Sequence, residues 1–90
     1  MTKAELIVAV ANRAELTKRQ AGHAIEAIFD EIESALRSGD RVALTPFGMF
    51  VVREHKARNG RNPKTGETIS IAARKVPAFV AGKSLKNAIR

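Results

Sequence analysis

The chain has 90 residues, enough for one domain and too few for a multidomain enzyme. Sixteen Lys and Arg against nine Asp and Glu leave a formal net charge of +7, and the absence of Cys excludes a disulfide framework, a thiolate zinc site and a cysteine nucleophile. The 44% apolar content argues against disorder, and neither the short apolar runs nor the N-terminus, with acidic Glu5, is typical of a membrane span or an export signal.

Two helices are predicted in the first half of the chain. Residues 2–5 (Thr-Lys-Ala-Glu) form a capping box, so a helix should begin there and end at residue 13 or 14. Residues 17–20 (Thr-Lys-Arg-Gln) repeat this signature before a longer helix over 18–38. That helix should end at Ser38-Gly39, because glycine readily adopts the left-handed conformation that follows many helices.

The second helix has a wider apolar face than one short helix and a small sheet can cover. We therefore predict a homodimer with a shared core, which would also present two copies of any basic surface. Eight apolar side chains are assigned to this core: Ile25, Ile28, Phe29, Ile32, Leu36, Phe47, Phe50 and Phe79.

Two helices joined by a short turn could also form a DNA-reading helix-turn-helix. The second helix nevertheless carries a net charge of −1, with Glu26, Asp30 and Glu33 in its centre, and would be repelled by phosphates. No Cys or His cluster accompanies these acids, so we interpret them as a solvated face and expect neither a catalytic pair nor a metal site.

Two hairpins are predicted in the second half. The alternating residues 41–45, the turn at 46–48 and the apolar run at 49–52 indicate the first hairpin. Residues 53–75, called the arm below, have little apolar content, and the cluster of turn residues at 59–66 should be the tip of a second hairpin. Each flank of the arm has room for about ten strand residues, or roughly 30 Å. A lone ribbon of this kind is marginal in water, so the arm is expected to move freely or to fold onto a partner.

The positive charge is concentrated in the second half. Residues 1–50 carry six basic and seven acidic residues, whereas residues 51–90 carry ten basic residues against Glu54 and Glu67. The arm accounts for +5 of this charge, and a short basic helix over 82–90 adds more. Such an asymmetry favours a polyanion-binding surface over a solvated loop. A phosphate-binding P-loop is excluded, because Glu67 stands where that motif requires Lys.

Four sequence segments, in this order and spacing, resemble the bacterial histone-like DNA-binding protein family of HU and integration host factor. They are Phe47-Gly48-Met49-Phe50, Gly60-Arg61-Asn62-Pro63-Lys64-Thr65-Gly66, Val76-Pro77-Ala78-Phe79 and Gly82-Lys83-Ser84-Leu85-Lys86. The resemblance covers essentially all 90 positions. It implies an α+β fold: an intertwined homodimer with two N-terminal helices, a small antiparallel sheet with long protruding β-hairpin arms, and a short C-terminal helix.

The resemblance also implies one HU-type DNA-binding domain over 1–90, with a helical dimerisation part at 1–38, a DNA-binding arm at 53–75 and a C-terminal helix at 82–90. HU and integration host factor are known examples of minor-groove proteins that kink DNA with apolar wedges, which assigns Pro63 as the wedge. The DNA-binding residues implied are Arg53, His55, Lys56, Arg58, Arg61, Asn62, Pro63, Lys64, Arg74, Lys75, Lys83 and Lys86.

Two residues depart from the family pattern. His55 stands where many members have a permanently basic residue, so it is a candidate for pH-dependent DNA affinity, with a tolerated substitution as the alternative. Pro46 stands where the family commonly has glycine, and it has no backbone N–H. Any contact that the family makes through this N–H is therefore not expected in this chain.

The function expected is that of a non-enzymatic nucleoid-associated protein of the bacterial cytoplasm. It would bind double-stranded DNA with low sequence specificity, bend and compact it, and use no cofactor or metal. Bent, nicked or junction DNA are candidate preferred forms. The alternatives are a sequence-specific bending factor like integration host factor and a basic RNA-binding or structural module. An enzyme is disfavoured, because His23 and His55 lie outside any nucleophile or metal pattern.

Overall fold

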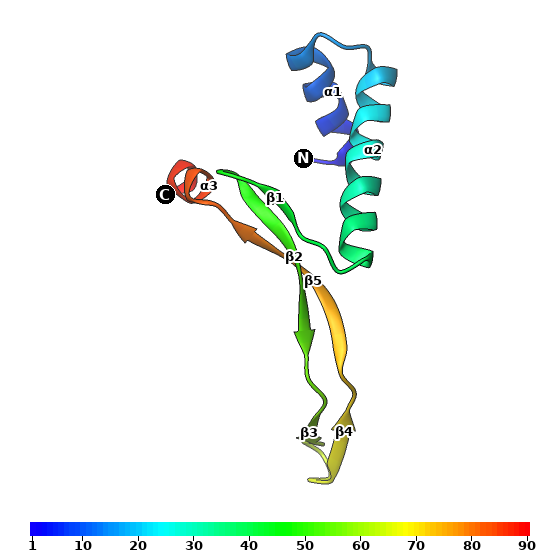
Figure 1. Ribbon diagram of the computed structural model, residues 1–90, viewed down its shortest axis with the longest axis vertical. Helices are drawn as coiled ribbons and strands as arrows, with labels where there is room; N and C mark the ends of the chain where they lie inside the picture. Colours follow the sequence, from blue (N-terminus) through cyan, green and yellow to red (C-terminus); the bar gives the residue numbers. More distant parts are fainter. The chain divides into compact units, whose positions relative to one another are not determined.

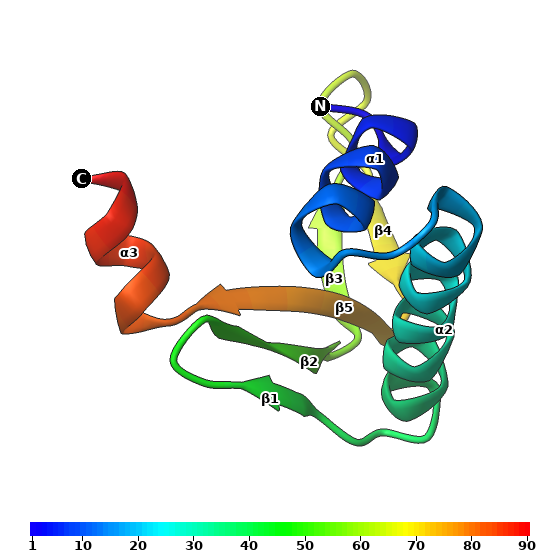
Figure 2. The same ribbon diagram turned by 90° about the horizontal axis from the view of Figure 1, so that it is seen from above.

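The computed structural model describes residues 1–90, which divide into two compact units, Met1–Ala35 and Leu36–Arg90. Each unit is described separately below (Figures 1 and 2). The elements in chain order are α1 (Lys3–Ala14), α2 (Lys18–Arg37), β1 (Val42–Leu44), β2 (Gly48–His55), β3 (Arg58–Arg61), β4 (Thr68–Ile71), β5 (Arg74–Ala81) and α3 (Lys83–Ile89). No helix is both long enough and apolar enough to cross a membrane.

The helix caps predicted at Thr2 and Thr17 are present in the first unit, where α1 and α2 lie side by side (Figure 1). The full capping box forms at Thr17, whereas at the other cap the Glu5 carboxylate accepts from the Thr2 hydroxyl and not from the Thr2 N–H. The hydroxyl oxygen of Thr2 accepts a hydrogen bond from the backbone N–H of Glu5 at 3.2 Å. The Thr17 hydroxyl accepts from the N–H of Gln20 at 3.1 Å, and the Gln20 side chain accepts in return from the N–H of Thr17 at 3.0 Å. These bonds satisfy N–H groups that have no partner inside the helix, which explains why the helices begin where they do.

The ends of the helices differ in backbone strain. Gly39 follows α2 with φ +85° and donates its N–H to the carbonyl of Leu36 at 3.0 Å, which confirms the predicted left-handed glycine. Glu15 ends α1 in the same left-handed region, with φ 57° and ψ 45°, although it carries a Cβ. This conformation is unfavourable for residues other than glycine and asparagine.

The buried apolar core within the chain is very small. Ala11, Ala21 and Ile25 are the three apolar side chains that are buried, and no large side chain is fully buried. On the same helix as Ile25, Ile28 is 54% exposed and Phe29 is 47% exposed. The chain by itself therefore leaves much of the predicted apolar face of α2 uncovered.

The second unit contains an antiparallel sheet in the order β1-β2-β5. The β1-β2 hairpin confirms the first predicted hairpin, and its register pairs Val42 with Phe50. Across β2 and β5, Phe50 stands opposite Phe79, with ring centroids 4.9 Å apart. Phe47 lies 5.8 Å from Phe79, so three aromatic rings gather on this sheet, although Phe47 and Phe79 remain 52% and 41% exposed.

Two glycines allow close contacts at the β1-β2 turn: Gly82 lets the start of α3 approach the turn, and Gly48 lets Phe79 of β5 lie against β2. Gly82 donates its N–H to the carbonyl of Phe47 at 2.7 Å, and Ser84 donates to the carbonyl of Pro46 at 3.3 Å. A Cβ on Gly82 would lie 2.1 Å from that Pro46 oxygen, and one on Gly48 would lie 2.4 Å from the ring of Phe79. The contact of Pro46 with α3 thus uses its carbonyl oxygen and does not need the N–H that proline lacks.

The arm corrects two sequence-based expectations. It is not one continuous ladder, because two residues on each flank, 56–57 and 72–73, separate the β2-β5 pair from a second two-stranded sheet of β3 and β4. The register nevertheless continues without a slip, since His55 pairs with Arg74 and Arg58 pairs with Ile71.

The turn at the tip is also shorter than predicted, because residues 59–61 belong to β3 and the tip loop is residues 62–67. Gly60 fits in the strand because it has no side chain. A Cβ there would lie 2.9 Å from the terminal methyl group of Ile71 and 3.6 Å from Ile69.

The strain at Glu15 leads to a stability prediction. Glu15→Gly should stabilise the protein by about 1 kcal/mol, because removal of the Cβ relieves the left-handed strain by more than the added flexibility of the unfolded chain costs. Glu15→Ala is the control, since it removes the same charge and keeps the strain. Chemical denaturation of both variants measures the difference, and equal midpoints for the glycine and alanine variants would contradict this origin.

Candidate nucleic-acid interface

All the residues predicted to bind DNA lie in the second unit, on the arm and on α3. Each is exposed except Asn62, which is half-buried in the tip loop. An ion pair joins Lys3 and Glu26 in the first, helical unit. None of the arm's cations is neutralised by a carboxylate of the same chain, so their charge is available to a partner.

The cations occupy both faces of the arm, because successive side chains of a strand point to opposite sides. Arg53 and His55 share one face of β2, with Arg74 opposite His55. Lys75 stands on the other face, opposite Glu54. In the second sheet, Arg58 stands opposite Ile71, and Arg61 stands opposite Thr68 on the other face. A ribbon charged on both faces fits between two rows of anions better than against one flat anionic surface.

The tip loop is bonded to itself. The N–H of Asn62 donates to the carbonyl of Glu67 at 2.8 Å, and the N–H of Gly66 donates to the carbonyl of Asn62 at 2.7 Å. The Asn62 side chain accepts from the N–H of Lys64 at 2.9 Å, and the Thr65 hydroxyl accepts from the N–H of Glu67 at 3.2 Å. Gly66 takes φ +73°, which allows the chain to reverse there.

These bonds leave Pro63 exposed at the turn, next to Lys64. Proline has no N–H that would need a partner, and its ring fixes φ. An apolar ring held on a loop with internal hydrogen bonds has the form expected of a wedge.

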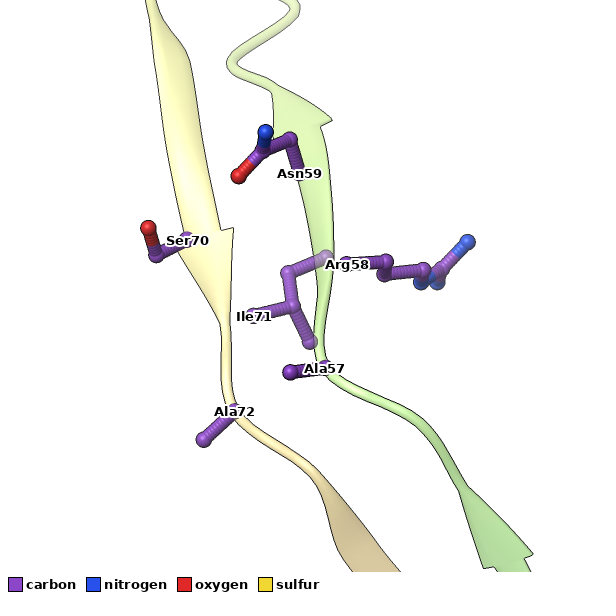
Figure 3. A pocket seen from close by; sticks show the side chains of 6 residues that line it. All are labelled: Ala57, Arg58, Asn59, Ser70, Ile71 and Ala72. Carbon is purple, nitrogen blue, oxygen red and sulfur yellow. The ribbon is translucent and has the colours of Figure 1, made fainter.

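The interruption between the two parts of the arm leaves an open hollow of about 330 Å³ (Figure 3). The residues that line it are Ala57, Arg58, Asn59, Ser70, Ile71 and Ala72. Arg58 is the one charged side chain among them, and Figure 3 shows it pointing away from the opposite strand. The hollow has neither the convergent acids and bases nor the enclosure of a catalytic pocket.

The C-terminal helix contributes a second group of cations. Lys83 and Lys86 are exposed on α3, which has no acidic residue in its first turn. Leu85 is half-buried, whereas Ile89 is 79% exposed.

Two features of the structure are not predicted by the sequence. The ion pair between Lys3 and Glu26 joins residues 23 positions apart, so no local sequence pattern predicts it. A smaller open hollow of about 240 Å³ lies between α1 and α2 and includes His23 with Lys18 and Arg19. No group of three or more His, Cys, Asp or Glu side chains in the chain could hold a metal ion.

The fold and the interface together define a class of small α+β protein: a helical pair, a short antiparallel sheet and a basic β-ribbon that ends in a proline loop. The family described as Bacterial DNA-binding protein matches this chain over residues 1–90, and the chain belongs to that family. The predicted α+β fold class and the family resemblance are both confirmed.

Named relatives support the assignment over the full length. DNA-binding protein HU of Geobacillus stearothermophilus is 56% identical over 90 residues, covering 100% of both chains. DNA-binding protein HU of Streptococcus thermophilus is 57% identical over 88 residues, covering 98% of this chain and 97% of its own. The Anabaena HU-DNA cocrystal structure matches with a TM-score of 0.89 and 49% identity, covering 99% of this chain and 97% of that one.

Proposed function

We propose that this chain is a histone-like nucleoid protein that binds double-stranded DNA with low sequence specificity and bends and compacts it. The observation that carries the proposal is the exposed arm, whose seven basic residues have no carboxylate partner within the chain and surround a proline tip. The relatives named DNA-binding protein HU and the HU-DNA cocrystal support it. The role is non-enzymatic, and its place is the nucleoid in the bacterial cytoplasm.

The chemistry of the arm favours the backbone of a duplex over single-stranded nucleic acid. Arg and Lys bind phosphates and release condensed counterions, which gives affinity without reading the sequence. Proteins that bind single strands stack bases on aromatic rings, whereas the four Phe of this chain all lie outside residues 53–75. The two charged faces of the arm suit the minor groove, which has a phosphate row along each side. These features favour DNA duplex over the RNA-binding alternative.

In this proposal the twelve DNA-binding residues predicted from the sequence have distinct roles. The groove and its phosphates are approached by Arg53, His55, Arg58 and Arg61. Pro63 inserts between base pairs, and Asn62 and Lys64 lie on either side of it in the chain. The remaining cations, Lys56, Arg74, Lys75, Lys83 and Lys86, hold the flanking backbone. Unstacking costs a few kcal/mol per step, which the additional phosphate contacts of a bent duplex offset.

The acting form is a homodimer. Of the eight side chains assigned to the dimer core, seven are exposed or half-buried within the chain, and the eighth, Ile25, is already buried in the helical unit. A chain with so little internal core gains its stability from a second copy, and a two-fold dimer presents two arms. In this arrangement residues 1–38 provide the helical dimerisation part, 53–75 the arm and 82–90 the C-terminal helix.

A sequence-specific bending factor is the alternative within the same fold. Competition of a candidate site against bulk genomic DNA separates the two, because a specific factor prefers its site by roughly 10³ or more. A preference of that size would contradict the proposal, whereas similar affinities for unrelated duplexes support it.

Dimerisation is tested at the exposed apolar face of α2. Ile28→Glu should shift the protein towards unfolded monomer and lower its midpoint of thermal unfolding, because it places a charge in the shared core. The midpoint of the unchanged protein should rise with protein concentration, as it does when folding and association are coupled. Ile69→Glu is the matched control, since Ile69 is 45% exposed on the arm. Sedimentation should find the control dimeric, and a dimeric Ile28→Glu would contradict this interface.

Phosphate binding by α3 is tested by salt dependence. Lys86→Ala should reduce the magnitude of the slope of log Kd against log salt by about 1 for each phosphate contact removed. Arg13→Ala is the control, because Arg13 is an exposed cation on α1, outside the proposed interface. Binding titrations at several salt concentrations measure the slopes. Equal slopes for both variants would remove Lys86 from the interface, and affinity independent of salt in the unchanged protein would overturn the proposed function.

The wedge is tested by separating bending from binding. Pro63→Ala should reduce the DNA bend, measured by energy transfer between dyes at the duplex ends, and should weaken binding to straight DNA more than to nicked or prebent DNA. Pro77→Ala is the control, since Pro77 is an exposed proline in β5, away from the tip. Equal loss of affinity on straight and prebent duplexes would contradict the wedge role of Pro63.

A further inference from the structure

Asn59 and Gly60 form a chemically reactive pair in the arm. When glycine follows asparagine, its backbone nitrogen can reach the side-chain carbonyl carbon without obstruction from a Cβ. The chain has four Asn residues, and Asn59 is the one followed by Gly. The pair lies in β3, in the part of the arm proposed to enter the groove.

The surroundings of Asn59 leave the side-chain amide free to react. Asn59 is exposed, stands opposite Ser70 in register, and makes no hydrogen bond through its side chain. Figure 3 shows its amide group separate from the Ser70 hydroxyl. An amide without a partner in the chain loses nothing when its nitrogen leaves.

The backbone around Asn59 is held by a short ladder. β3 and β4 form a sheet of four residue pairs, separated from the β2-β5 pair by two residues on each flank. Extended strand geometry keeps the Gly60 nitrogen away from the Asn59 side chain, so the reaction requires local opening. A lone two-stranded ribbon opens at little cost in free energy.

The other three asparagines are protected. Asn12 lies inside α1 and Asn87 inside α3, where the helix restrains the backbone, and each is followed by a residue with a Cβ. Asn62 precedes Pro63, whose nitrogen carries no hydrogen, and its side-chain oxygen accepts from the N–H of Lys64. These residues serve as internal controls within the same molecule.

We propose that Asn59 is a site of spontaneous deamidation that reduces DNA binding by the arm and that bound DNA suppresses. The Gly60 nitrogen loses its proton to base and bonds to the side-chain carbonyl carbon of Asn59, while the bond from that carbon to the amide nitrogen breaks and ammonia leaves. Water then opens the cyclic imide and yields aspartate or isoaspartate. The net change consumes one water and releases one ammonia.

The consequence for binding rests on the proposed function, whereas the reaction does not. The product places a carboxylate between Arg58 and Arg61 and lowers the arm's net charge from +5 by one. An anion at that position repels the phosphates that both arginines would bind. DNA that holds the hairpin closed should slow the reaction, because the reactive geometry forms only when the strands separate.

The reaction is tested on the full-length protein in warm, mildly alkaline buffer without DNA. Intact mass should rise by one unit per event, and peptide mapping should place the change at Asn59 ahead of Asn12, Asn62 and Asn87. Asn59→Gln should stop it, because cyclisation would require a larger ring. Gly60→Ala should slow it, and its Cβ would displace only the flexible end of Ile71. An unchanged mass, or change at another asparagine first, would overturn the proposal.

Two further experiments separate this proposal from the proposed function. A nicked duplex of random sequence should slow the mass change, whereas an equal rate with bound DNA would overturn the protective role. Asn59→Asp should weaken binding and lower the magnitude of the salt slope by roughly 1 to 2 for a dimer with two arms, and wild-type binding by this variant would overturn the functional consequence. If the unchanged protein deamidates but binds no duplex, the proposed function fails and the modification stands.

Discussion

The constraint on which the rest of the structure depends is the scarcity of apolar burial within one chain. Three small or medium side chains are buried, while Ile28, Phe29 and Phe47 are about half exposed. Burial contributes roughly 25 cal/mol per Å² of apolar surface, so a chain that leaves its largest side chains in water gains little stability of its own. The association proposed above would complete the fold rather than join two finished domains.

Because the second chain would cover the apolar face, each chain can place its acidic and its basic residues in different regions. The acids cluster on the helical half, where Glu26 holds Lys3, and the cations extend along an arm that contains no core. An arm whose cations were paired with its own carboxylates would be more ordered in isolation, but would have less charge to offer phosphates. The unpaired cations of the arm therefore raise the free energy of the free chain, and a bound polyanion removes this cost.

Most of the fold could be predicted from local patterns, because its elements are set by local interactions. The helix caps at Thr2 and Thr17 and the left-handed Gly39 depend on residues three positions apart. The interruption of the arm's ladder could not be predicted, since residues 56–57 and 72–73 include neither glycine nor proline. Gly60 is typical of a turn, and only the structure shows that Ile69 and Ile71 occupy the space beside it. The ion pair of Lys3 with Glu26 depends on helix packing, which no local pattern specifies. The roles of the individual cations remain predictions.

The same weakness in the arm has two chemical results. A four-pair ladder that opens readily lets the tip adapt to a groove and gain its order from the partner, so part of the binding free energy is spent on closing the hairpin. Opening also brings the Gly60 nitrogen within reach of the Asn59 side chain. A stiffer arm would protect Asn59 and adapt less to DNA. The time an arm spends without DNA is therefore also the time during which it is exposed to a change that weakens its next encounter.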